Sequence, residues 1–186
     1  MQIRGLERLA AFDRYLSHQT TKLLNTPKKQ KVARILAHSG DSQLWLAGGF
    51  LLWRRGKAKQ KKLGEQIISI TILSSLFSYA LKGCIHRPRP EGQAGVLYLS
   101  FDPHSFPSGH ATRIGGLLAT ISSALPAHKR IALWLWGFTV CISRVALGIH
   151  FLGDITGGLL GGIGLGMLFL RSQWFRAHKK TLTETS

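Results

Sequence analysis

The sequence predicts an all-α fold: an integral membrane bundle of about five spanning helices, preceded by an amphipathic helix at the N-terminus. Apolar runs recur along the chain, short connections separate them, and positive charges gather in those connections. The runs cover residues 44–53, 67–81, 114–125, 131–147 and 155–170. The mean hydropathy of only +0.08 hides this pattern, because polar ends dilute the apolar middle. Several runs are short for a crossing, so the alternative is a helical protein with a buried core.

Residues 1–40 form a basic arm ahead of the predicted membrane core. Within it, residues 3–24 intersperse apolar positions with charges, which is typical of an amphipathic helix. Such a helix lies on a membrane surface or packs on the protein itself, and the sequence favours neither. Pro27 and the basic residues after it should end this helix. The predicted core then covers residues 41–171, and residues 172–186 form a polar tail.

The apolar runs differ in how well they fit a membrane crossing. A crossing of ~30 Å takes about 20 residues, so the first run spans only if the snorkelling Arg54 and Arg55 extend it. Residues 57–62 are predicted as a basic loop, the second run is the strongest span, and residues 83–107 are predicted to be irregular. In the last run, two rows of glycines would let helix backbones approach closely: Gly157 and Gly161, and Gly158, Gly162 and Gly166.

The charge balance is strongly basic, with 25 Lys and Arg against 8 Asp and Glu and a net charge of +17. This balance indicates a nucleic acid, an anionic lipid surface or an anionic substrate as partner. Because the charges gather between apolar runs, we expect a membrane and no nucleic acid. Cys84 and Cys141 provide neither a disulfide framework nor the spacing of a metal site. The oligomeric state is left open.

Two polar motifs flank the irregular segment between the second and third apolar runs. The first places Lys82 at a helix end and Arg89 seven residues later, which alone is typical of a basic membrane flank. The second lies directly before an apolar helix, whose free N–H groups favour a bound phosphate. There Ser108 can cap the helix, Gly109 lets the backbone approach a ligand, and His110 could donate a proton to a leaving group.

The third motif runs from Arg144 through His150 to Asp154 within an otherwise apolar stretch. Charged groups in such a stretch are costly to bury and usually line an interior site. If the segment is helical, His150 and Asp154 share one face, and the carboxylate would fix the tautomer of the histidine. This pairing suits a nucleophile or a base, but the residues do not decide which histidine, this one or His110, attacks.

Together the motifs supply the groups that stabilise a phosphate and its trigonal-bipyramidal transition state. The cations are Lys82, Arg89 and Arg144, and they are joined by two histidines, a carboxylate and a helix N-terminus. No cluster of Asp and Glu offers a Mg²⁺ site. We therefore expect neither a metal nor a cofactor, with the cations supplying the charge stabilisation.

The motifs resemble those of the type 2 phosphatidic acid phosphatase superfamily, K-x6-R-P, then P-S-G-H, then S-R-x5-H-x3-D. All spacings match, in Lys82 to Pro90, Pro107 to His110 and Ser143 to Asp154, and the resemblance covers roughly residues 40–170. It implies a membrane hydrolase that removes phosphate from a lipid phosphate or diphosphate without a metal. Among its members, the chain is most similar to short bacterial ones acting on polyprenyl or glycerol lipids.

The resemblance also implies roles for the site residues. His150 would attack phosphorus and form a phosphohistidine, and Asp154 would orient it. His110 would protonate the leaving alkoxide and then activate water. The phosphate oxygens would be held by Lys82, Arg89, Arg144, Ser108 and the N–H of Gly109.

Four other polar residues near the motifs are interpreted without a catalytic role. His86 and Arg87 are read as headgroup contacts or solvated charges, and His104 as a loop residue. Arg113, one turn after His110, is read as an interfacial charge.

Two other functions compete with the phosphatase. A vanadate-dependent haloperoxidase has a similar anion site, but its known members are soluble, so the apolar runs argue against it. A non-enzymatic basic membrane protein would bind anionic lipid or nucleic acid, and it leaves the three motifs unexplained. For the phosphatase, the sequence leaves the lipid open among phosphatidic acid, phosphatidylglycerol phosphate, undecaprenyl diphosphate, a prenyl phospho-sugar and a lipid A phosphate.

The loop charges predict a multi-pass protein of the cell membrane with a definite orientation. If each apolar run crosses once, Lys82, His110 and Asp154 lie on one side, together with the N-terminus. The opposite side carries more positive charge near the helix ends, from Arg54, Arg55, Lys57, Lys59, Lys61, Lys62, Lys129, Arg130, Arg171, Arg176, Lys179 and Lys180. Positive charge is retained in the cytoplasm, so the site should face the extracytoplasmic side.

Overall fold

The computed structural model describes residues 2–90 and 102–184, and the regular elements in these residues are all helices. They are α1 (Gln2–Leu23), α2 (Pro27–Ser39), α3 (Ser42–Arg55), α4 (Ala58–Cys84), α5 (Gly109–Ile121), the short 3₁₀ helix η2 (Ser122–Ala124), α6 (Ala127–Ala146) and α7 (Leu152–Glu184). An isolated antiparallel bridge joins Pro88 to His104. The all-α prediction is confirmed for the described residues.

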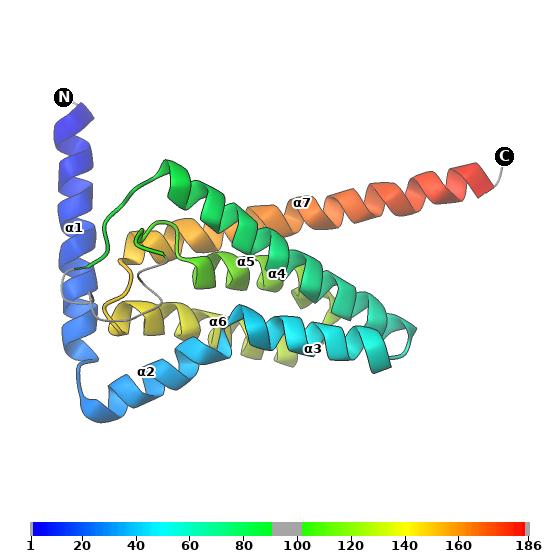
Figure 1. Ribbon diagram of the computed structural model, residues 1–186, viewed down its shortest axis with the longest axis horizontal. Coiled ribbons are helices and arrows are strands. Elements are labelled where there is room, and N and C mark those ends of the chain that lie inside the picture. The colour runs from blue at the N-terminus through cyan, green and yellow to red at the C-terminus, as the bar shows by residue number, and fades with distance from the viewer. Residues whose placement is uncertain (1, 91–101, 185–186) are drawn as a thin grey trace.

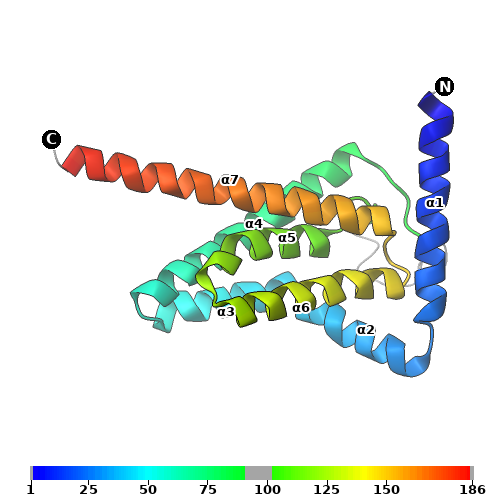
Figure 2. The same cartoon turned by 180° about the vertical axis from the view of Figure 1, so that it is seen from behind.

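Helices α3 to α7 run roughly along one direction, whereas α1 crosses one end of this bundle (Figure 1). The view from behind shows the same arrangement, with α1 standing across the end where α7 begins (Figure 2). Helix α5 lies inside, packed against α4, α6 and α7, while α3 packs against α4 and α2 against α6. The end of α4, the start of α5, the end of α6 and the start of α7 therefore meet near α1, and these are the places of the three motifs.

Close backbone contact between α5 and α7 sets the start of one helix beside the start of the other. A Cβ atom at Gly158 would lie 2.7 Å from the carbonyl oxygen of Ser108, and one at Gly166 would lie 2.9 Å from that of Gly116. Only glycine leaves room for so close an approach. The predicted glycine row that contains Gly158 and Gly166 is confirmed as the contact surface of α7 with α5.

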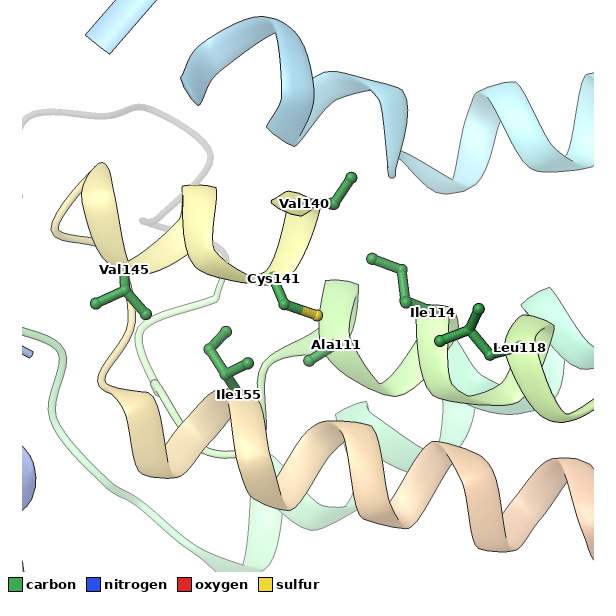
Figure 3. Packing of buried hydrophobic residues seen from close by; sticks show 7 residues of the cluster. All are labelled: Ala111, Ile114, Leu118, Val140, Cys141, Val145 and Ile155. Carbon is green, nitrogen blue, oxygen red and sulfur yellow. The ribbon is translucent and has the colours of Figure 1, made fainter. Parts of the chain in front are cut away.

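An apolar core joins α5, α6 and α7 next to the motifs. Figure 3 shows its buried side chains, which are Ala111, Ile114, Leu118, Val140, Cys141, Val145 and Ile155. Close-packed interiors resist displacement of their elements. This core therefore keeps the helices that carry the second and third motifs in fixed relative positions.

Helix boundaries differ from the prediction in three places. Pro27 opens α2, with the Thr26 side chain as its cap, rather than only closing α1. Proline fits there because the first turn of a helix has no use for its missing N–H. The basic loop predicted at 57–62 is wrong, since α4 begins at Ala58. The predicted polar tail begins inside α7, which continues to Glu184.

Two helices are long and apolar enough to cross a membrane, α4 over Ala58–Cys84 and α7 over Leu152–Gln173. Helix α3 has only 14 residues. The helix predicted over residues 3–24 is confirmed as α1, and large apolar side chains on it are exposed, among them Leu9 and Phe12. These features are consistent with membrane insertion, and the count of five spans stays a prediction.

Candidate active site

One cavity of about 220 Å³ gathers polar residues of all three motifs. Its wall comes from the end of α4, the start of α5, the end of α6 and the loops between them. The predicted site residues in this wall, hereafter the phosphate cavity, are Lys82, Arg89, Gly109, His110, Arg144 and His150. The other two, Ser108 and Asp154, are fully buried and adjoin the wall.

Lys82 and Arg89 both bind the carboxylate of Asp102, a residue that the sequence did not single out. Lys82 Nζ lies 2.7 and 2.6 Å from the two carboxylate oxygens, and Arg89 Nη2 lies 3.1 Å from Oδ2. Lys82 also donates to the carbonyl oxygen of His104 at 3.0 Å. The two cations therefore converge on one oxyanion, as phosphate binding would require.

His150 lies in the loop before α7 rather than within a helix. The loop turns at Gly148, whose φ of 66° favours glycine, and returns the histidine against α7. His150 Nδ1 lies 3.5 Å from Asp154 Oδ2, which is ion-pair distance but longer than a good hydrogen bond. His150 Nε2 lies 3.3 Å from Arg89 Nη1. The predicted pair is present, although a loop and not a helical face brings it together.

Charge and burial leave His150 neutral. The pKa of His150 is lowered to about 4, chiefly by burial and also by the nearby Arg144 and Arg89, while Asp154 opposes this shift. The neutral imidazole is the form in which a histidine is nucleophilic. Asp154 is itself fixed, because its Oδ2 accepts a hydrogen bond of 2.9 Å from Phe151 N.

His110 is also paired with a carboxylate, one that the sequence did not single out. His110 Nε2 lies 2.8 Å from Oδ1 of Asp41, the residue just before α3. The other oxygen of Asp41 lies 2.9 Å from His38 Nδ1. The hydrogen bond with His110 lowers the pKa of Asp41 to about 2, against the effect of burial and with help from His38. An ionised carboxylate therefore stands behind each of the two site histidines.

Arg87 links the site to α1, and its interpretation as a solvated or headgroup charge is wrong. Its Nη1 lies 2.8 Å from Asp154 Oδ1, and its Nη2 lies 2.6 Å from Asp13 Oδ2. Its guanidinium lies 4.4 Å from the centre of the Phe151 ring. Asp13 also accepts a hydrogen bond of 2.8 Å from Gly153 N, so α1 caps α7 while it holds Arg87.

Arg113 is not an interfacial charge either, because only 7% of it is exposed. Its Nη1 donates a hydrogen bond of 2.7 Å to the carbonyl oxygen of Gly40, and its side chain lines the phosphate cavity. His104 occupies a loop as predicted, and its ring meets that of His86 edge-on at 4.6 Å. Arg113 thus joins the cations of the site.

Ser108 ties the second motif to the third. It caps α5, and its side chain accepts a bond of 3.5 Å from Ala111 N. Its own N–H donates to the carbonyl oxygen of Asp154 at 3.1 Å. The N-terminus of α5 is thereby held at the cavity, with Gly109 in the wall.

The sequence profile of the PAP2 superfamily matches residues 65–178, more than half of the chain. The chain belongs to the PAP2 superfamily. Lipid A 1-phosphatase of Rhizobium etli is 28% identical over 155 residues, covering 72% of this chain and 66% of that protein. Phosphatidylglycerophosphatase B of Bacillus subtilis is 29% identical over 158 residues, covering 78% and 74%.

A solved structure agrees with this assignment. It is described as the first transmembrane PAP2 type phosphatidylglycerolphosphate phosphatase from Bacillus subtilis. At 25% identity it aligns with a TM-score of 0.67, covering 91% of this chain and 87% of that one. The chain spans just under two thirds of the length of its lipid A 1-phosphatase relatives, 66% and 65%.

All the predicted site residues lie within the PAP2 match, whereas Asp13 and Asp41 precede it. Sequence reasoning missed these two, together with Asp102. The sequence signal that could have found them is the scarcity of acidic residues, because the chain has only 8 Asp and Glu against 25 Lys and Arg. Four of those acids contact the histidines or arginines of the site or Lys82: Asp13, Asp41, Asp102 and Asp154.

Proposed function

We propose that this PAP2 chain is a membrane-bound phosphatase that removes phosphate from a lipid phosphate or diphosphate through a phosphohistidine. The observation that carries the proposal is the placing of His150, with Asp154 behind it, beside Lys82 and Arg89 at one small cavity. The names of the relatives, phosphatases of lipid A and of phosphatidylglycerophosphate, support a lipid substrate.

In the first step, His150 Nε2 attacks phosphorus and the ester P–O bond breaks. Asp154 holds the imidazole through Nδ1 and stabilises its positive charge. The leaving oxygen takes a proton from His110 and departs as an alcohol, or as a phosphate when the substrate is a diphosphate. Because His110 Nε2 contacts Asp41, the nitrogen available to the leaving oxygen is Nδ1.

In the second step, a water molecule attacks the phosphohistidine. His110 takes a proton from this water, the P–N bond breaks, and His150 returns to its neutral form as inorganic phosphate leaves. Asp41 acts as a positioning residue in both steps. Its carboxylate orients the His110 ring and stabilises the imidazolium while His110 carries the proton.

Fixed cations would stabilise the charge that develops on the phosphoryl oxygens. Lys82, Arg89 and Arg144 line the cavity, and the N-terminus of α5 adds backbone N–H groups. In residues 2–90 and 102–184, no group of three or more His, Cys, Asp and Glu side chains is placed to hold a metal ion. The proposed reaction therefore relies on protein cations and needs no metal.

The proposed membrane arrangement has α3 to α7 as five spans and α1 on the membrane surface. The apolar lengths of α4 and α7 and the transmembrane relative support it. Helix α1 crosses the end of the bundle and exposes Leu9, Phe12 and Leu16 on one face. The domain division at residues 41 and 171 and the outward-facing site belong to the same proposal.

Phosphate release by the purified protein in detergent tests the proposed function. The substrates are phosphatidic acid, phosphatidylglycerol phosphate, undecaprenyl diphosphate and lipid A, each assayed with EDTA and with Mg²⁺. We expect release from at least one lipid, with the same rate under both conditions. Release from none, or activity lost in EDTA and restored by Mg²⁺, would contradict the proposal.

A further inference from the structure

A second and larger cavity, of about 710 Å³, adjoins the phosphate cavity. The two share His110, Arg113 and Arg144 in their walls. The rest of the larger wall comes mostly from α2 and the turn into α3, including Gln30, Arg34, His38, Asp41, Ser42 and Gln43. Gln30, Arg34 and His38 follow one another at intervals of four residues, so they share one face of α2. Helix α2 and the turn into α3 precede the PAP2 match, so this part of the wall lies outside the matched residues 65–178.

The position of His110 decides what enters the larger cavity. In phosphoryl transfer the attacking and leaving atoms lie roughly in line on opposite sides of phosphorus. His150 lines the phosphate cavity, His110 lies at the junction and lines both cavities, and its partner Asp41 lines the larger one. The group that departs with the leaving oxygen therefore lies on the His110 side, in the larger cavity.

The charge of the larger cavity is positive and is not balanced by its own acids. Arg34 is exposed and forms no ion pair with a described residue. Arg113 is buried, its Nε has no acceptor in the described part of the chain, and it forms no ion pair with a described carboxylate. Asp41, the one acid in the described wall, is already shared by His110 and His38.

A buried guanidinium without a carboxylate is costly unless an anion joins it. We propose that the larger cavity is a subsite for a second phosphate, one that stays on the leaving group of the lipid substrate. Arg34 and Arg113 would bind its oxygens. Gln43 Nε2 would donate to an ester oxygen beside it, and Gln30 Oε1 would accept from a hydroxyl, because Gln30 Nε2 already donates to the carbonyl oxygens of Leu24 and Ala146. This inference rests on the proposed function and names the preferred substrates, which are lipids with two neighbouring phosphates.

Two kinds of lipid carry such a retained phosphate. In a lipid diphosphate, it is bonded directly to the leaving oxygen. In a glycerol headgroup, it is a phosphodiester separated from that oxygen by the glycerol carbons. The shared chemistry is a phosphate anion on the leaving-group side, and matched substrates distinguish the two sources.

The test compares substrates that differ in the second phosphate. Phosphatidylglycerol phosphate is paired with phosphatidic acid of the same acyl chains, and farnesyl diphosphate with farnesyl monophosphate. The variant is Arg34→Ala, whose exposed site should tolerate the change. The control is Lys28→Ala, because Lys28 on the same helix lines a separate apolar groove between α2 and α6.

We expect Arg34→Ala to raise KM about tenfold for a substrate with the second phosphate and to leave KM for its partner unchanged. An effect in only one substrate pair identifies the headgroup of that pair as the source of the retained phosphate. Lys28→Ala should change KM for neither pair. As a second readout, methylenediphosphonate should inhibit the wild type more strongly than methylphosphonate, and Arg34→Ala should remove that advantage.

Three results would overturn the inference. Arg34→Ala could change KM equally within each pair, change it for no substrate, or keep the preference for methylenediphosphonate. If the wild type still hydrolyses phosphatidic acid, only the subsite is wrong. If it hydrolyses no lipid phosphate, the proposed function fails and this inference fails with it.

Discussion

Each histidine at the site is backed by a carboxylate, and the two pairs are built differently. His150 and Asp154 are four residues apart, and the loop before α7 brings them together. His110 and Asp41 are 69 residues apart, and the packing of the start of α3 near α5 brings them together. The first pair suits a nucleophile and the second a group that gives and takes protons.

Replacing Asp41 by Asn should slow the reaction by weakening proton transfer. Asn keeps a hydrogen-bond partner for His110 but cannot stabilise the imidazolium. We expect kcat to fall about tenfold or more for a lipid phosphate, whose alkoxide needs a proton to leave. For p-nitrophenyl phosphate, whose leaving group needs no proton, bond cleavage should change much less.

The control for this prediction is His38→Ala, which removes the other partner of Asp41 from an exposed position. It should leave both rates close to those of the wild type. An equal loss for the lipid and for p-nitrophenyl phosphate in Asp41→Asn would show a structural role instead of a positioning role.

At the scale of elements, α1 acts as a clamp on the start of α7. Asp13 accepts a hydrogen bond from Gly153 N, and Ser17 Oγ accepts one of 2.9 Å from Leu152 N. Asp13 also binds Arg87, which binds Asp154. A helix outside the PAP2 match thus supports the carboxylate behind the nucleophile.

Asp13→Ala should destabilise the protein and reduce kcat together. It removes a helix cap and the ion pair of Arg87, and we expect the Tm in detergent to fall by about 3–6 °C. Arg14→Ala, at the exposed neighbouring position, should leave Tm and kcat nearly unchanged. A Tm for Asp13→Ala equal to that of Arg14→Ala would show that the clamp contributes nothing.

Glycine-to-alanine substitutions at two positions of α7 should change the stability of the fold in opposite directions. A Cβ at Gly158 would lie 2.7 Å from the Ser108 carbonyl oxygen, whereas one at Gly164 would meet nothing within 4 Å. Gly158→Ala should therefore destabilise the fold by about 1–3 kcal/mol. Gly164→Ala should stabilise it by roughly 0.5–1 kcal/mol, because alanine favours helix. Thermal unfolding that ranks the two variants equally would contradict this packing.

Features that depend on residues close together in the sequence were predicted, whereas features that depend on residues far apart were not. The motif residues and the glycine row of α7 are local patterns, and the structure gathers both as expected, although His150 lies in a loop and not on the helical face. Helix α2 was missed because Pro27 serves equally to end a helix and to begin one. The roles of Asp41 and Arg113 were missed because their partners lie 69 and 73 residues away, and only tertiary packing reveals them.

At the scale of the whole molecule, the site lies at the bundle end that α1 crosses, and the basic turn between α3 and α4 lies at the other (Figure 1). Arg54 and Arg55 end α3 there. The proposed orientation puts that basic end in the cytoplasm. The natural cysteines provide a probe, because Cys84 at the site end of α4 is exposed and Cys141 is buried.

An impermeant thiol reagent should label Cys84 in intact cells, and Cys84→Ser should abolish the labelling. A reporter fused after Ser186 should read as cytoplasmic. Labelling that appears only after the cells are made permeable would reverse the orientation and leave the proposed chemistry unaffected.

The central claim is that His150 carries the phosphoryl group between the two steps. The measurement is to mix purified protein with a lipid phosphate radiolabelled in its phosphate, in EDTA, and to quench within milliseconds. We predict a label on the protein that survives base, is lost in acid, and is absent in His150→Ala, which should be inactive. Asp154→Asn should remain folded and form the label more slowly. Full turnover with no labelled protein, or a tenth of the activity retained in His150→Ala, would contradict the account.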